Sequence, residues 1–316
     1  MDRKQPSLCV LACAAGVVFP TLSLLAQDQE PDGFVIRSDV RLVLLDVSVK
    51  DRAGRPVSGL KRDQFRVFED GKPQTVTEFA NSDIPVTVGL VIDESFSMRP
   101  KRDDVLAAAF TFIGESNPLD ETFVVNFNDT VKLGLPTGTP FSGNGQELQA
   151  ALFRGVPEGR TALNDAVIVG LKHLGLGRRA KKTLVVISDG GDNASVHTRR
   201  QLIDMVERTP ATIYTIGLYT GEDPDRDPGL LTRLAHMSGG DVYLPEKPTE
   251  MLAICRRIAK DIRARYTIGY IPARGSGKAD LRHIRVKVSA PGHGALTART
   301  RTSYRYDVNP ATRGGG

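Results

Sequence analysis

One short loop of this sequence carries oxygen donors at alternate positions. The apolar run VTVGLVI, at positions 86–92, is followed by Asp93, Ser95 and Ser97. Near-continuous apolar runs of this kind are typical of strands covered on both faces, and ligands of such sheets bind beyond the carboxyl ends of the strands. A carboxylate and two hydroxyls are hard donors, which suit Mg²⁺, Mn²⁺ or Ca²⁺. Taken alone, the same residues are equally well explained as helix caps.

Two further segments add donors from other parts of the chain. The segment GRTALNDA, at positions 159–166, places Thr161 before a predicted helix. The segment TLVVISDGGDN, at positions 183–193, is a second predicted buried strand that ends in acids, the first of them Asp189. This three-part pattern resembles the metal-ion-dependent adhesion site of von Willebrand factor type A domains. The resemblance implies that one divalent cation, Mg²⁺ or else Mn²⁺ or Ca²⁺, is bound by Asp93, Ser95, Ser97, Thr161 and Asp189.

The resemblance also implies how such a site works. In the family pattern the two serines and Thr161 bind the metal directly in some states, whereas Asp93 and Asp189 act partly through water. Few direct carboxylates leave the ion electrophilic, and an open position can accept a carboxylate from a protein partner. The resemblance therefore implies a protein-binding, adhesion-type function without catalysis.

Acidic neighbours of these residues allow more than one interpretation. Glu94 lies inside the first loop, where we expect it to point away as a surface charge. If it pointed inward, it would occupy the open metal position and block a partner. Asp165 and Asp192 could support the metal ligands, but capping of a helix and solvation of a loop explain them equally well.

Two other functions are compatible with the sequence. A metal-dependent hydrolase of the phosphoesterase type also uses acids at strand ends, but it would need more carboxylates and a general base, and the sequence identifies none. Alternatively, the metal only stabilises the loops of a structural module. A serine nucleophile is disfavoured because Ser95 and Ser97 lack a Gly-x-Ser-x-Gly turn and a histidine partner, and no Gly-Lys-Ser/Thr phosphate loop occurs.

The elements that must position the candidate ligands alternate between strands and helices from residue 85 to residue 264. Such alternation is typical of a doubly wound, mostly parallel α/β sheet, which is also the fold that the resemblance implies. Strands are predicted near 86–92, 122–127, 183–188, 211–218 and 241–244, with a short edge strand in a hairpin at 131–135. Helices are predicted near 99–115, 146–153, 162–175, 198–208, 228–238 and 249–264.

Strand patterns without helices flank this region. Residues 34–84 contain alternating apolar segments, in which Asp70-Gly71 indicates a hairpin. Residues 265–306 contain three more such segments, the last at 296–306. Because each flank is too short to fold well alone, we expect the two to pack into one discontinuous β-sandwich. The flanked arrangement is similar to that of the acidobacterial-type von Willebrand factor A-related family of secreted proteins.

The ends of the chain predict export. Residues 1–26 begin with basic side chains, continue with an apolar stretch and end at a small residue, which is typical of a signal peptide. A membrane anchor is the alternative, but polar residues follow at once in the linker 27–33. We expect cleavage, no membrane span in the mature protein, and a periplasmic or extracellular location. Residues 307–316 are predicted to be a disordered tail.

Composition narrows the class of partner. The 316 residues carry a net charge of +5, with 25% charged and 40% hydrophobic residues, which is ordinary for a globular protein. The charge is spread along the chain and no nucleic-acid-binding motif occurs, so DNA or RNA is not an expected partner. Because Cys9 and Cys13 lie in the predicted signal peptide, Cys255 is expected to be a buried thiol without a disulfide.

Overall fold

The computed structural model describes residues 42–81, 83–219, 226–273 and 280–306. The predicted signal peptide, linker and tail lie outside these residues, as does the part of the amino-terminal flank before residue 42. Within the described ranges, no helix combines the length and the apolar character that crossing a bilayer requires.

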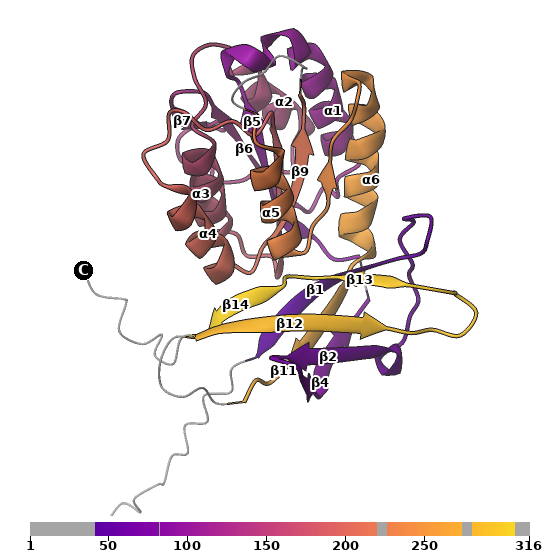
Figure 1. Ribbon diagram of the computed structural model, residues 1–316. Helices are drawn as coiled ribbons and strands as arrows, with labels where there is room; N and C mark the ends of the chain where they lie inside the picture. The colour runs from indigo at the N-terminus through magenta and orange to yellow at the C-terminus, as the bar shows by residue number, and fades with distance from the viewer. Residues whose placement is uncertain (1–41, 82, 220–225, 274–279, 307–316) are drawn as a thin grey trace, which may run out of the picture. The chain divides into compact units, whose positions relative to one another are not determined.

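A six-stranded sheet forms the centre of the α/β region (Figure 1). In spatial order its strands are β10 (Val242–Tyr243), β9 (Thr212–Gly217), β8 (Lys181–Ser188), β5 (Val86–Asp93), β6 (Glu121–Phe127) and β7 (Val131–Leu133). All neighbours are parallel except β6 and β7, which form an antiparallel edge hairpin. Every residue of β5 is buried, as its apolar run predicts for a strand covered on both faces. The predicted mostly parallel sheet is confirmed.

Helices cover this sheet in two groups (Figure 1). The α-helices of the described chain are α1 (Arg102–Gly114), α2 (Gly145–Phe153), α3 (Leu163–Leu174), α4 (Arg199–Arg208), α5 (Pro228–Ser238) and α6 (Met251–Ala264). α1 contacts both α2 and α6, whereas α4 contacts both α3 and α5. Short 3₁₀ turns are η1 (Arg62–Gln64), η2 (Phe96–Lys101) and η3 (Pro248–Glu250). The turn η2 replaces the first part of the helix predicted at 99–115, because Pro100 interrupts regular helical bonding there.

The flanking segments form two antiparallel sheets of four strands each, in the orders β13-β1-β11-β4 and β14-β12-β2-β3. Their bounds are β1 (Val43–Lys50), β2 (Phe65–Glu69), β3 (Lys72–Gln74), β4 (Val76–Ala80), β11 (Tyr266–Tyr270), β12 (Asp280–Val288), β13 (Thr297–Arg299) and β14 (Ser303–Tyr306). Each sheet mixes strands from before and after the α/β region, since β1 pairs with β11 and β2 pairs with β12. Neither flank completes a sheet without the other.

The prediction of one continuous alternating segment at 296–306 is wrong. It consists of two strands, β13 and β14, which belong to different sheets. Between them, the N–H of Ile284 donates to the Thr302 carbonyl at 2.8 Å, and the N–H of Thr302 donates to the Met237 carbonyl at 3.0 Å. The chain therefore crosses from one sheet to the other within the polar stretch at 299–303, between the two strands.

The buried apolar side chains form two clusters. One fills the α/β region, and the other is made by strands of the two antiparallel sheets. Cys255 belongs to the first cluster, is unpaired, and has its thiol pKa raised to about 12 by burial. The predicted buried thiol is confirmed.

Candidate metal centre

The candidate ligands lie where the two middle strands of the parallel sheet end. β5 and β8 are neighbours, with Ile92 opposite Ile187, so Asp93 and Ser188 follow next in register. The strand order reverses at β5, because β6 lies on one side of it and β8 on the other. In open α/β sheets, ligands bind at such a point, outside the carboxyl ends of the strands. The topology therefore brings the loop after β5 and the loop after β8 together.

Hydrogen bonds tie four of the five candidate ligands into one cluster. The carboxylate of Asp93 accepts from the Ser95 N–H at 2.9 Å and from the Ser188 hydroxyl at 2.5 Å. The Ser97 hydroxyl donates to Asp189 Oδ2 at 2.5 Å, and the hydroxyl oxygens of Ser95 and Ser97 are 3.1 Å apart. Two loops that are far apart in the sequence thus present their oxygens to one small volume.

Thr161 belongs to a third loop that is bonded to the other two. The N–H of Phe96 donates to the Gly159 carbonyl at 3.1 Å, which joins this loop to the one after β5. The Thr161 N–H donates to Asn193 Oδ1 at 2.9 Å, and its carbonyl accepts from the N–H groups of Asn193 and Ala194. The three loops are therefore in mutual contact. Among the described residues, no direct hydrogen bond links the Thr161 hydroxyl to the other four candidates.

The electrostatics of the cluster favour a cation. Asp93 and Asp189 are both buried, and no basic side chain of a described residue forms an ion pair with either. Burial raises the pKa of Asp93 to about 7, with a further contribution from the charge of Asp189, against the hydrogen bonds from Ser188 and Ser95. Two buried carboxylates with no cation between them are unfavourable. A bound divalent ion would neutralise both.

The kinds of donor agree with the predicted class of metal. All five candidate groups are oxygens, which suits Mg²⁺, Mn²⁺ or Ca²⁺. Among the described residues, no cluster of three or more His, Cys, Asp or Glu side chains is arranged to hold a metal. The site thus offers hydroxyls and two carboxylates, and it lacks the carboxylate-rich or histidine-rich set of most hydrolytic metal centres.

Glu94 is not the surface charge that the sequence predicted. Its side chain is 3% exposed, and Oε2 accepts from Arg102 Nε at 3.2 Å. Burial raises the pKa of Glu94, and Arg102 opposes that rise. The main chain fixes the direction in which the Glu94 side chain points, because the Glu94 N–H donates to the Phe127 carbonyl and the Glu94 carbonyl accepts from the N–H of Glu158. The carboxylate therefore meets Arg102 and none of the candidate ligands.

Replacing Glu94 with glutamine should leave the affinity for Mg²⁺ within about threefold of the wild-type value, a change of under 1 kcal/mol. Glutamine keeps the length of the side chain, and the carboxylate oxygen Oε1 that it replaces is buried without a partner. Isothermal titration of chelator-stripped protein with Mg²⁺ provides the measurement. A gain of tenfold or more would mean that Glu94 occupies the metal position after all.

Several residues outside the predicted ligand set hold the loops in place. Asp165 accepts from the N–H groups of Val196 and His197 at 2.8 and 2.9 Å, so it fastens the loop after β8 to α3. Asp192 accepts hydrogen bonds from Asn164 at the start of the same helix. Ser188 and Asn193 were not predicted as functional, although both stand in segments that the pattern identified. Their roles depend on partners in other loops, which spacing along the chain does not show.

The match to known proteins covers the region of the site. A family model of the von Willebrand factor type A domain matches residues 88–191, which include all five candidate ligands. No curated protein sequence matches the chain.

Solved structures resemble a larger part of the chain. A von Willebrand factor type A protein from Catenulispora acidiphila is 15% identical, with a TM-score of 0.50 over 85% of this chain and 74% of that one. BatB from Bacteroides thetaiotaomicron is 14% identical, with a TM-score of 0.44 over 56% and 98% of the two chains. Proximal thread matrix protein 1 from the mussel byssus, in a structure with a zinc-occupied MIDAS motif, is 15% identical, with a TM-score of 0.48 over 57% and 48%. At these identities the likeness to the first of them shows a shared fold and no more.

Proposed function

We propose a binding function for this chain, which contains a von Willebrand factor type A domain. In this proposal the protein is exported, holds one divalent cation, and uses it to capture a carboxylate of a protein partner without catalysis. Mg²⁺ is the expected ion, with Mn²⁺ or Ca²⁺ as substitutes. The ligands are Asp93, Ser95, Ser97, Thr161 and Asp189.

The observation that supports this proposal is the pair of buried carboxylates, Asp93 and Asp189, which are joined through the Ser95 N–H and the hydroxyls of Ser95 and Ser97 and lack a basic partner among the described residues. The hydroxyls of Ser95, Ser97 and Thr161 add donors without adding negative charge. When bound, a divalent ion would supply a Lewis-acidic position that a further oxygen ligand can fill. The chain itself supplies the enclosure, because three mutually bonded loops hold the donors at the mouth of the sheet.

The surface around the site suits contact with a protein. Phe96, which lies between the two candidate serines, is 63% exposed, and Val196, in the loop after β8, is 87% exposed. The guanidinium of Arg99 stacks 4.9 Å from the centre of the Phe96 ring and donates to the Pro157 carbonyl, so the ring is held on a fixed loop. Exposed apolar side chains beside a charged centre are typical of interfaces with a few dominant contacts. We therefore expect an acidic partner residue with apolar neighbours.

Substitution of Thr161 with alanine tests this function. The main-chain contacts of Thr161 with Asn193 and Ala194 do not use the hydroxyl, so the fold should persist while the affinity for Mg²⁺ falls by roughly tenfold or more. Pull-down from a cell-envelope extract, with Mg²⁺ or with chelator, should then show partner capture by wild type in Mg²⁺ only. A matched variant, Phe96→Ser, should keep the affinity for Mg²⁺ but lose capture.

The same samples separate the two alternatives. A metal-dependent hydrolase predicts turnover of phosphate or carboxylic esters that requires metal and vanishes in Asp189→Ala. A structural metal predicts metal-dependent melting together with partner capture that persists in chelator. Capture at unchanged strength after chelation would refute the adhesion-type function.

A further inference from the structure

The side of α6 that faces the solvent is basic. Arg256, Arg257 and Lys260 are separated by one, three and four residues, so they lie on the same side of the helix. All three are exposed, whereas Cys255 and Ile258, on the opposite side, are buried. The helix therefore packs an apolar side against the core and presents a positively charged side to the solvent.

An open groove of about 350 Å³ lies between this basic side and the turn after β1. The helix lines it with the three basic residues and Ala253, and the turn lines it with residues 53–56. The turn is held in shape by Asp51, which accepts from the N–H groups of Ala53 and Arg55, each at 2.9 Å. Its carboxylate also pairs with the Arg55 guanidinium at 2.8 Å. The turn thus supplies a fixed wall, and the charge of the groove comes mainly from the helix.

Most of this positive charge is uncompensated. Arg256 has one acidic neighbour, Glu115, whose carboxylate lies 3.8 Å away. Neither Arg257 nor Lys260 forms an ion pair within the parts of the chain that the structure describes. Lys260 follows the two arginines by four and three residues, and like charges at such spacing destabilise a helix. An anion in contact with the three cations would relieve this repulsion.

We propose that this groove binds a phosphate group, independently of the metal centre. Arginine can bind phosphate through two parallel hydrogen bonds, and lysine adds a compact charge. A phosphate monoester carries about 1.5 to 2 negative charges at pH 7, so it suits three neighbouring cations better than a single carboxylate does. None of the described residues that line the groove is aromatic, so it offers a nucleobase no ring to stack on. The ligand is therefore a soluble phosphate compound or a lipid head group.

Inorganic pyrophosphate is a suitable probe, titrated calorimetrically into metal-stripped protein so that it cannot bind through a divalent cation. We expect binding that weakens as the salt concentration rises. The double variant Arg257→Gln/Lys260→Gln should bind at least about tenfold more weakly, because it loses two charge-assisted contacts. Its melting temperature should not fall, since the repulsion between the two side chains is removed, and this excludes unfolding as the cause.

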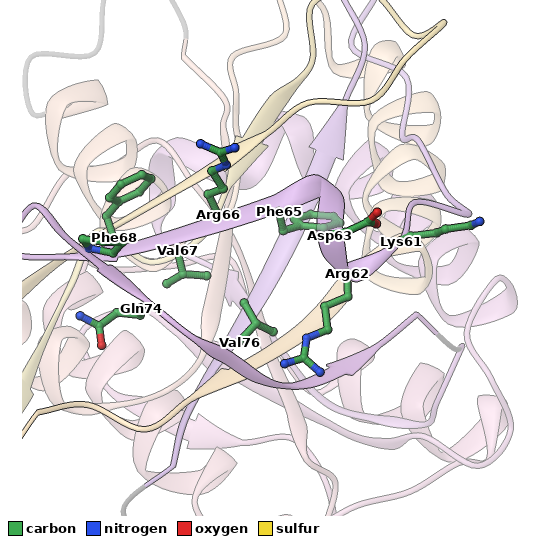
Figure 2. Close-up of a pocket in the computed structure, with 10 residues that line it drawn as sticks. Lys61, Arg62, Asp63, Phe65, Arg66, Val67, Phe68, Gln74 and Val76 are labelled. Carbon is green, nitrogen blue, oxygen red and sulfur yellow. The ribbon is translucent and has the colours of Figure 1, made fainter.

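The matched control is Lys61→Gln/Arg62→Gln, which removes the same two charges from a different groove, beside β2. Both residues are exposed, and Figure 2 shows their side chains pointing in different directions, so they do not form one anion site. This variant should bind pyrophosphate as wild type does. A similar loss in both double variants would mean that only net charge matters, and it would overturn the proposal.

Vesicles distinguish the two sources of phosphate. If a lipid head group is the ligand, wild type should sediment with phosphatidylcholine vesicles that contain phosphatidic acid, and pyrophosphate should release it. Binding of pyrophosphate without sedimentation would instead identify a soluble phosphate compound, and either result supports a phosphate site. Absence of pyrophosphate binding to wild type would overturn the proposal. So would tighter binding of citrate than of pyrophosphate, which would assign the groove to carboxylates.

Discussion

Replacing Asp93 with alanine should lower the affinity for Mg²⁺ and Mn²⁺ by at least about a hundredfold. Loss of a group that only supports a ligand commonly costs 10- to 100-fold in metal affinity, so loss of a carboxylate at the centre of the cluster should cost no less. Asp93 accepts from both Ser95 and Ser188 and thereby joins the loop after β5 to the end of β8. No other acid of the first loop can replace it, because Glu94 is directed to Arg102.

The fold of Asp93→Ala should survive, because the loss of hydrogen bonds is offset by the removal of a buried charge. The alanine leaves the Ser188 hydroxyl and the Ser95 N–H without their acceptor, which costs roughly 1–3 kcal/mol for a buried group. It also removes a buried charge that is close to Asp189 and has no basic partner, and this gain offsets much of the loss. The metal-free melting temperature should therefore change little.

Calorimetric titration of chelator-stripped protein measures the effect, with Asp103→Ala as the matched control. Asp103 is an exposed acid in the first turn of α1, close in sequence to the metal loop but outside the cluster. It should bind Mg²⁺ as wild type does. If Asp93→Ala binds Mg²⁺ as tightly as wild type, the proposed site is wrong.

The parts of the fold that follow from periodicity could be predicted from the sequence. β5 and β8 contain long apolar runs. A strand with apolar side chains on both faces must be covered on both sides, which a parallel sheet between two layers of helices provides. Their parallel pairing then follows from the helices between them. Since ligands of such sheets bind beyond the carboxyl ends of the strands, the loops after both strands could be identified as candidates before any coordinates were known.

Side-chain directions within those loops could not be predicted in the same way. The sequence places Glu94 in solvent, because acids in loops are usually exposed. Its partner Arg102, however, lies beyond a 3₁₀ turn, and Arg102 also donates to the Gly155 carbonyl of another loop. The Gly155 position is so close to Glu94 that an added Cβ would lie 2.2 Å from Oε1. Such contacts join segments that are distant in sequence, so no local pattern records them.

Arg265 is another residue whose role the sequence did not show. It directly follows α6, and arginine at a helix end is usually an exposed charge. Its side chain is instead 1% exposed and lies 2.9 Å from the Asp46 carboxylate of β1. It also donates to the Tyr214 hydroxyl at 3.0 Å and to the Gly239 carbonyl at 2.9 Å. One side chain thus joins a strand of the flanking sheets to the α/β region.

Replacing Arg265 with methionine should lower the free energy of unfolding by about 3–5 kcal/mol, because a buried charge network would lose its cation. Asp261, 1% exposed and 3.4 Å from Arg265, would keep only Lys50 as a basic partner. Although burial alone would raise it, the pKa of Asp261 is lowered, first by Arg265 and then by Lys50. Hydrogen bonds from Ser48 and Tyr214 lower this pKa further, so the two cations and two hydroxyls together keep the carboxylate charged.

Chemical denaturation of Arg265→Met measures this loss, and thermal melting should show a decrease of roughly 6–20 °C for a domain of this size. Arg256→Met, in α6, is the matched control. Arg256 is exposed and forms only a weak surface ion pair with Glu115, at 3.8 Å, so this substitution should change the free energy of unfolding by under about 0.5 kcal/mol. Adding Asp261→Asn to Arg265→Met should restore part of the loss, because the unpaired carboxylate is then gone. Wild-type stability in Arg265→Met would mean that the network contributes nothing net, and that the flanking sheets are held to the α/β region by apolar packing instead.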